Sequence, residues 1–288
     1  MGLLLILFLN CISTAGTIFK KNYVNNTSDV KASLNIFMLL THIIAAGYFF
    51  ILAKGSVPLN IPTAMFSAAY GTVCLSSVWF TMVGFNKTNL VYISVFSGAG
   101  SVIIPFVLEL CFSSQSFSIS QILSVVLRMI AILIPLFSKQ KGNKGLAICF
   151  ILFLISGFAG IIPKMYAENP TVLSNNGFCF WTNIFIIPFV LILVLKNDGI
   201  KQLSSDMKKI GLINYAYIFS GTAISNISSL MLLYILTFVS ATVYSVLSSS
   251  CGLILTALVS KLIYKEKLTK QILLSAAVSV LAIICGAF

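Results

Sequence analysis

Charged residues are scarce in this chain of 288 amino acids. Aspartate and glutamate together number six, and charged residues of both signs make up 8% of the sequence, against about 25% in ordinary soluble domains. Hydrophobic residues make up 59%, and the mean hydropathy is +1.05. A soluble globule of this composition would have too little polar surface to face water. We therefore predict that most of the chain lies in a lipid bilayer.

Residues that build catalytic or metal centres are equally scarce. The chain has one histidine, and its seven cysteines show no spacing that is typical of zinc sites or disulfide frameworks. It has no glycine-rich phosphate loop and no nucleophile placed beside a base. We therefore expect no enzyme activity, no metal and no cofactor. Clustered arginines with interleaved aromatics are also missing, so no nucleic-acid partner is expected.

Long apolar stretches are what the sequence does contain. Each holds roughly 18–25 residues, which is enough for a helix to cross the hydrocarbon core of a bilayer. The first stretch has no charged residues before it and no small-residue cleavage site, so we interpret it as a retained helix and not as a signal peptide. Ten transmembrane helices are expected over 2–19, 34–53, 61–85, 89–112, 119–137, 144–163, 177–195, 210–236, 240–263 and 269–287.

The chain also contains matched segments at a nearly constant offset. AGTIFK at 15–20 returns as AGIIPK at 159–164, and VYISVFS at 91–97 returns as VYSVLS at 243–248. A third match joins QIL at 121–123 to QIL at 271–273, again in the same order. Such an internal duplication in a very apolar chain is typical of transporters that are built from two repeats. We predict one five-helix repeat over 1–140 and a second over 141–288.

The distribution of lysine predicts how the two repeats are oriented. Because five is an odd number, the second repeat should cross the membrane in the opposite direction, and matched loops should differ in lysine content. The segment 113–118 carries no charge, whereas its counterpart 261–267 carries three lysines. Summed over the predicted loops, fifteen lysines fall on one side and two on the other. We therefore expect an all-α integral membrane protein with ten transmembrane helices in two inverted five-helix repeats.

The same count predicts localisation. Basic loops resist translocation and favour the anionic inner leaflet of the membrane. We expect the cell inner membrane, with the lysine-rich loops in the cytoplasm and both termini on the outside.

The last loop and helix contain a further pattern. Glu266 is followed by Leu268, Thr269 and Gln271, and then by an apolar helix rich in small residues. This pattern resembles the end of an EamA-type repeat of the drug/metabolite transporter superfamily. In the first half only Gln121 stands at a matching position. The resemblance implies ten helices, a central cavity between two inverted repeats and transport without ATP hydrolysis. It also implies cytoplasmic termini, whereas the lysine count predicts the outside.

Polar residues inside the expected helices form two matched sets. Polar side chains at membrane depth tend to face the bundle interior or a pathway. In 61–85 they recur every three or four residues, which keeps them on one face, and 210–236 repeats part of this pattern. Small residues in 89–112 and 240–263 could instead serve close helix packing. The candidate pathway residues are Asn10, His42, Ser67, Tyr70, Cys74, Ser77, Trp79, Tyr92, Ser97, Ser101, Thr222, Asn226, Ser229, Tyr244, Ser248 and Gly252.

Few ionisable groups fall inside the expected helices, and each has two interpretations. His42 is either a proton relay or a neutral histidine that is bonded to a backbone carbonyl. Glu109 and Arg128 flank one short loop and form either a structural ion pair or a coupling site. Lys20 and Lys164 occupy matched repeat positions at helix ends, where they are interpreted as interfacial anchors.

These observations predict a carrier. A pathway with many hydroxyls and aromatics and little negative charge suits neutral, zwitterionic or aromatic metabolites, such as amino acids or nucleosides. We expect a secondary transporter that works by alternating access, as a monomer or homodimer, with a small-molecule substrate, the bilayer and a candidate coupling proton as partners. A non-transporting membrane scaffold or partner subunit is the alternative, and saturable flux separates the two.

Overall fold

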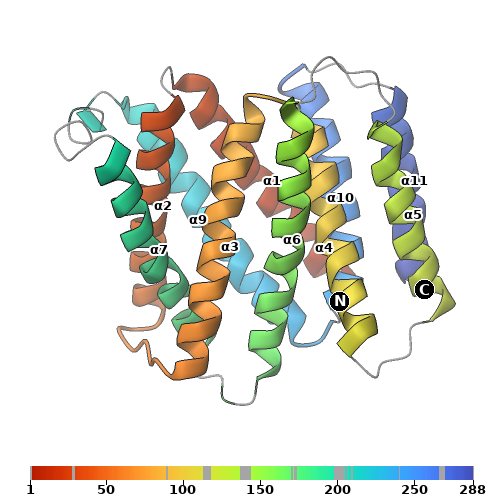
Figure 1. Cartoon of the computed structure of the whole chain (residues 1–288), viewed down its shortest axis with the longest axis horizontal. Helices are drawn as coiled ribbons and strands as arrows, with labels where there is room; N and C mark the ends of the chain where they lie inside the picture. Colours follow the sequence, from red (N-terminus) through yellow and green to blue (C-terminus); the bar gives the residue numbers. More distant parts are fainter. Residues whose placement is uncertain are drawn as a thin grey trace.

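The expected helices are all found in the computed structural model. It describes residues 2–27, 30–88, 90–112, 118–136, 144–169, 171, 174–197, 205, 207–208, 210–239, 241–265 and 270–287. In these residues the chain forms ten α-helices and no strand (Figure 1). The helices are α1 (Gly2–Asn26), α2 (Val30–Leu52), α3 (Ile61–Phe85), α4 (Leu90–Phe112), α5 (Ile119–Leu136), α6 (Lys144–Glu168), α7 (Asn175–Asn197), α9 (Leu212–Leu236), α10 (Ala241–Leu262) and α11 (Lys270–Ala287).

Seven of these helices are long and apolar enough to cross a membrane: α1, α2, α3, α6, α7, α9 and α10. The other three contain shorter apolar segments, over Tyr92–Leu108, Ile119–Ala131 and Leu273–Ala282. The chain is therefore a helical membrane protein.

Three helices extend beyond the predicted boundaries, and one of them, α2, begins at Val30 and not at residue 34. The prediction ends α1 at residue 19 because lysines follow, but the helix continues to Asn26. Tyr23 and Val24 lie in this extension and are buried, so tertiary packing keeps the polar turn helical. In the same way α6 continues through Pro163 to Glu168, and Tyr166 in its last turns is fully buried.

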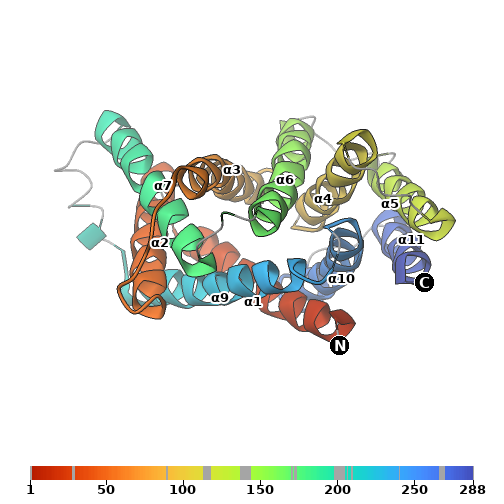
Figure 2. The same ribbon diagram turned by 90° about the horizontal axis from the view of Figure 1, so that it is seen from below.

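The helices are arranged in two layers. Viewed along the bundle, α7, α3, α6, α4 and α5 form one layer, and α2, α9, α1, α10 and α11 form the other (Figure 2). Across the layers α2 packs on α7, α4 on α10 and α5 on α11. Each layer thus combines helices from both halves of the sequence. The repeat boundaries at 140 and 141 stay a prediction.

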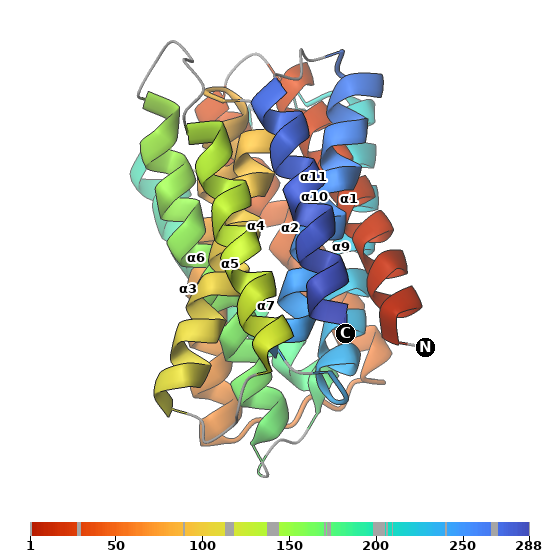
Figure 3. The ribbon, with the colours of Figure 1, turned by 90° about the vertical axis from the view of Figure 1, so that its right-hand side faces the viewer.

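Both termini lie at the same end of the bundle. The side view shows the N-terminal end of α1 and the C-terminal end of α11 at the lower end (Figure 3). The last turns of α1 and α10 and the first turn of α11 lie at the opposite end.

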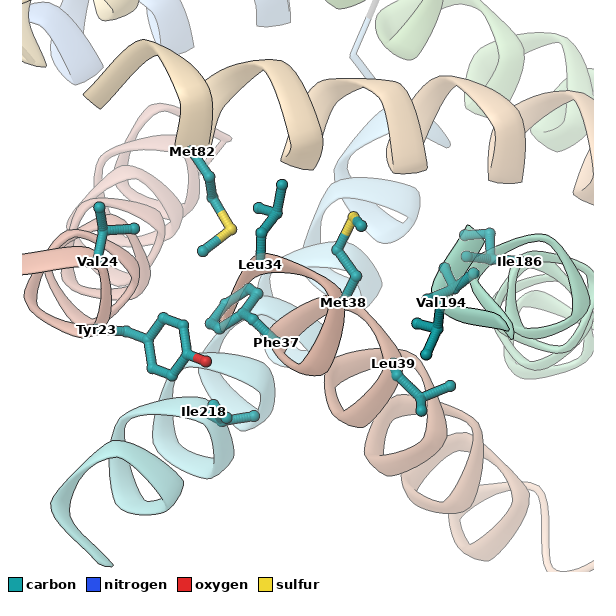
Figure 4. Close-up of a cluster of buried hydrophobic side chains, with 11 residues drawn as sticks. Tyr23, Val24, Leu34, Phe37, Met38, Leu39, Met82, Ile186, Val194 and Ile218 are labelled. Atoms are coloured by element: carbon teal, nitrogen blue, oxygen red, sulfur yellow. The ribbon is translucent and has the colours of Figure 1, made fainter. Parts of the chain in front are cut away.

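A cluster of buried apolar side chains joins the layers at one side of the bundle. It brings together residues of α1, α2, α3, α7 and α9, among them Tyr23, Phe37, Met38, Met82 and Ile218 (Figure 4). Lipid tails are as apolar as these side chains, so their burial gains little from leaving water. Close van der Waals contact is what holds this cluster together.

Helices α4 and α6 approach each other closely. A Cβ atom on Gly100 would overlap the carbonyl group of Phe153, and one on Gly157 would overlap Ile104. Near this contact Ser156 Oγ donates a hydrogen bond to the carbonyl oxygen of Ser97 at 2.7 Å. Glycine at both positions lets the two backbones meet, as small residues do between membrane helices.

We expect Gly100→Ala to destabilise the protein, because its methyl group cannot fit against α6. Overpacking of this kind lowers the free energy of unfolding by about 1–3 kcal/mol. The change would be measured as a lower apparent melting temperature in detergent, followed by circular dichroism. Gly47→Ala in α2 is the matched control, because nothing lies within 4 Å of its added Cβ. Equal losses in both variants would contradict a special α4–α6 contact.

Candidate functional site

A cavity of about 400 Å³ lies between six helices, α1, α3, α4, α6, α9 and α10. This volume falls in the range of about 300–1,000 Å³ that is common for small-molecule sites. Of the 21 described residues that line the cavity, 12 carry a hydroxyl group, so its wall can hydrogen-bond a polar solute. They are Thr17, Tyr70, Thr81, Ser94, Ser97, Ser101, Ser156, Tyr244, Ser245, Ser248, Ser249 and Thr256.

Helices α4 and α10 supply most of these hydroxyls because their serines and threonines recur every three or four residues. Many are held by local bonds. Ser101 Oγ donates to the Gly98 carbonyl oxygen at 2.9 Å, and Thr256 Oγ1 lies 3.0 Å from Ser94 Oγ. A hydroxyl that donates to a backbone carbonyl keeps lone pairs free to accept a bond. The wall is therefore ordered before any solute enters.

Two tyrosines place aromatic surface in the same cavity. Tyr70 is stacked on Phe178, with ring centroids 5.4 Å apart, and Phe178 is stacked on Tyr166 at 4.2 Å. On the other layer Ser248 Oγ lies 3.4 Å from the hydroxyl of Tyr244. Rings that are fixed in this way can contact an apolar or aromatic part of a ligand without loss of much conformational freedom.

A smaller cavity of about 260 Å³ lies between α1 and α9. Its wall includes the hydroxyls of Ser13, Ser225, Ser228 and Ser229. It shares four residues with the main cavity, namely Thr17, Lys20, Leu232 and Tyr244. The two spaces therefore adjoin at residues of α1, α9 and α10.

Seven of the predicted pathway residues line these cavities. Tyr70, Ser97, Ser101, Tyr244, Ser248 and Gly252 line the main cavity, and Ser229 lines the smaller one. Asn10 lies directly behind the wall, because its Oδ1 accepts a hydrogen bond from Ser248 Oγ at 3.1 Å.

Four predicted residues, of which Cys74 is half-buried and the others are buried, lie in helix contacts and not in the cavity wall. Ser67 Oγ donates to the Phe178 carbonyl oxygen at 3.2 Å, and Thr222 Oγ1 donates to that of Ile218. Tyr92 belongs to a hydrophobic cluster with residues of α6 and α10, and Cys74 packs against the cluster of Figure 4. Regular spacing on one helix places residues on a face, but packing against neighbouring helices decides which of them line the cavity.

Three other predicted residues also lie outside the cavity wall. Trp79 is 40% exposed and meets Phe80 edge to face, so it lies on the surface of the bundle, where lipid would be. Ser77 is half-buried and lines neither cavity. Asn226 is buried, and its Nδ2 has no hydrogen-bond partner within the described residues.

His42 lies between α2 and α7, away from both cavities. Its Nδ1 is 2.8 Å from Asn183 Oδ1, and Asn183 Nδ2 donates to the Cys179 carbonyl oxygen at 2.8 Å. The histidine thus has a side-chain partner in place of the expected backbone carbonyl. Its Nε2 is buried without a partner in the part of the chain that is described. Asn183 itself was not expected, because a lone amide in an apolar helix gives no spacing signal.

Arg128 is fully buried at the junction of α5, α10 and α11. Its Nη1 donates to Ser279 Oγ at 2.6 Å, and its Nη2 donates to the Ser249 carbonyl oxygen at 3.1 Å. The side chain of Glu109 lies outside the described residues, so the predicted Glu109–Arg128 ion pair stays a prediction.

Lys20 is a cavity residue that sequence reasoning placed at the membrane interface. It lies six residues before the end of α1 and lines both cavities. Its repeat counterpart Lys164 lines neither, and pairs with Glu168 at 3.0 Å. The spacing of Ser13, Thr17 and Lys20 was the available signal, because steps of four and three residues share one helix face.

The comparisons with known proteins bear on the fold alone. No protein-family model matches the sequence, and no curated protein matches it. Among solved structures 28 chains match. One is a crystal structure of a protein whose description states no activity. It has a TM-score of 0.67 and 12% sequence identity, covering 98% of this chain and 94% of that chain. The whole arrangement of helices therefore recurs in another protein.

Ser97→Cys should react with a charged, water-soluble thiol reagent in the folded protein, because Ser97 lines the main cavity. The change would be made in a version whose seven cysteines are replaced by alanine, and labelling would be followed by mass spectrometry. Ser124→Cys is the matched control, since Ser124 in α5 is fully buried and should react only after denaturation. Absence of reaction at position 97 in the folded protein would contradict a water-accessible cavity.

Proposed function

We propose that this protein is a secondary transporter of small metabolites, working by alternating access in the cell inner membrane. The observation that carries the proposal is the cavity itself. A space of about 400 Å³ lies among apolar helices, and more than half of the described residues that line it carry a hydroxyl group. Polar groups inside a membrane protein are costly and usually serve a solute pathway.

The pairing of helices supports two inverted repeats. If α1, α2, α3, α4 and α5 correspond to α6, α7, α9, α10 and α11, each major contact has a counterpart. The α1–α9 contact corresponds to α6–α3, α4–α6 to α10–α1, and α3–α7 to α9–α2. Exchange of the two halves leaves three contacts unchanged, namely α2–α7, α4–α10 and α5–α11. A pseudo-two-fold axis in the membrane plane would produce this pattern.

The distribution of lysine supports the proposed orientation. The end of the bundle opposite the termini receives the last turns of α1 and α10 and the first turn of α11. Lys21 lies five residues before the end of α1, Lys261 in the last turn of α10, Lys265 three residues beyond α10, and Lys270 at the start of α11. We place this end in the cytoplasm and both termini outside. The EamA-like pattern at 266–271 supports a carrier but implies cytoplasmic termini, and on orientation we follow the lysine count.

Two prolines give the cavity helices points at which they could bend. Pro105 lies inside α4 and Pro163 inside α6, and each removes one backbone hydrogen bond of its helix. The position of a Cβ on Gly160 would be 3.6 Å from the ring of Pro105, so the two helices meet at this level. A hinge here would move α4 and α6 against α1 and α10 and change which end of the cavity is open.

Counterflow in proteoliposomes tests the proposal. Vesicles loaded with one metabolite at millimolar concentration should take up the same labelled metabolite in a saturable manner, and a screen of amino acids and nucleosides would find it. Tyr70→Ala should raise the half-saturating concentration about tenfold, because it removes an aromatic contact worth about 1.5–3 kcal/mol when fully buried.

Trp79→Ala is the matched control on the same helix, and it should leave the flux unchanged because Trp79 faces outward. Strong uptake of quaternary ammonium ions with none of amino acids or nucleosides would contradict the substrate class. A complete lack of saturable flux would favour a scaffold.

His42→Ala should lower the melting temperature but leave the effect of a proton gradient on flux unchanged. The reason is that His42 holds α2 to α7 through Asn183 and lines neither cavity. Flux would be measured with and without an imposed pH difference across the vesicle membrane. Loss of the gradient's effect at an unchanged melting temperature would instead assign His42 to a proton relay.

A further inference from the structure

Lys20 is the feature of the cavity that the proposed function does not use. It is the only residue with a formal charge among the described residues that line either cavity. Two other lysines of the chain, its repeat counterpart Lys164 and its neighbour Lys21, have partners. Lys164 pairs with Glu168, and the amine of Lys21 lies 3.9 Å from the ring centroid of Tyr264. No described residue pairs with the amine of Lys20 or accepts a hydrogen bond from it.

The position of Lys20 places the charge inside the bundle. Ser13, Thr17 and Lys20 lie on one face of α1, and Thr17 and Lys20 line both cavities. The helix continues for six residues beyond Lys20, and Tyr23 and Val24 in that stretch are buried. A charged amine in such surroundings is costly without a counter-charge. An anion in the cavity would supply one.

A second cation lies behind the part of the cavity wall that α4 and α10 form. The Nη2 atom of Arg128 bonds the carbonyl oxygen of Ser249, and it lies 2.5 Å from the point where a Cβ on Gly98 would stand. Both Ser249 and Gly98 line the main cavity. The missing side chain of Gly98 therefore leaves the guanidinium close to the cavity surface. In a low-dielectric interior its field adds to that of Lys20.

We infer that Lys20 is the subsite for an anionic group of the cargo, so that the transported metabolites are small organic anions or zwitterions. This inference rests on the proposed function and makes its substrate class narrower. The anionic group is a carboxylate or a phosphate, whose oxygens accept from a lysine amine. The hydroxyls of α4 and α10 and the rings of Tyr70 and Tyr244 would contact the rest of the molecule. Neutral nucleosides and bare cations are excluded as preferred cargo.

Matched compound pairs test the inference. L-phenylalanine would be compared with L-phenylalaninamide, which lacks the carboxylate, and glycerol 3-phosphate with glycerol. Binding would be measured as thermal stabilisation of the purified protein, and transport as counterflow in phosphatidylcholine vesicles. At least one anionic member should bind and be transported at least about tenfold better than its partner, because a hydrogen bond to a charged group is worth that much. The pair that responds identifies carboxylate or phosphate.

Variants at the two matched lysines connect this preference to one residue. Lys20→Met should weaken binding of the anionic compound about 10- to 100-fold, and Lys20→Arg should keep most of it. Lys164→Met is the control, because Lys164 occupies the same repeat position but faces Glu168. The comparison within each compound pair uses the unmodified protein, so it stands even if Lys20→Met fails to fold.

The outcomes separate the two proposals. Saturable flux without preference for the anionic compound, or unchanged affinity in a folded Lys20→Met protein, overturns the inference and leaves the carrier in place. Anion binding that depends on Lys20 without any flux supports the subsite and overturns the carrier. Absence of binding by all four compounds overturns the inference, and a lack of saturable flux in the screen of amino acids and nucleosides overturns the carrier.

Discussion

A polar group inside a membrane must find its partner within the protein, because lipid offers none. This constraint applies to the backbone, to the buried polar side chains and to the cavity wall. It makes all described regular structure helical, and it turns hydroxyls of α4 and α10 toward one another, where Thr256 lies 3.0 Å from Ser94. It also gives the buried Arg128 a hydroxyl and a carbonyl as partners. In the main cavity, hydroxyls that bond within the protein also line a space that a solute could enter.

The helices could be predicted from the sequence because hydropathy is a local property. Seven of the ten agree with the structure within two residues at both ends. The ends of α1 and α6 could not be predicted in this way, since Lys20 and Lys164 look like interfacial residues in sequence. Only the tertiary burial of Tyr23 and Tyr166 shows that both helices continue.

Only part of the site can be predicted from the sequence, and the reason is physical. Spacing shows which residues share a helix face, but the neighbour that the face meets is decided by packing. Tyr70 therefore lines the cavity, whereas Cys74, one turn further along α3, packs into an apolar cluster. The sequence places Lys20 at the membrane surface, because a charged residue is expected to face water. Nothing in the sequence indicates the internal cavity that Lys20 lines.

The central claim is alternating access through the cavity. Labelling of one cavity residue from both faces of the membrane tests this claim most directly. Ser101 lines the cavity about halfway along α4. In an otherwise cysteine-free protein, a membrane-impermeant maleimide should label Ser101→Cys in right-side-out and in inside-out vesicles. A transported metabolite should shift the two rates in opposite directions. Labelling from one face only, whatever metabolite is present, would contradict alternating access through this cavity.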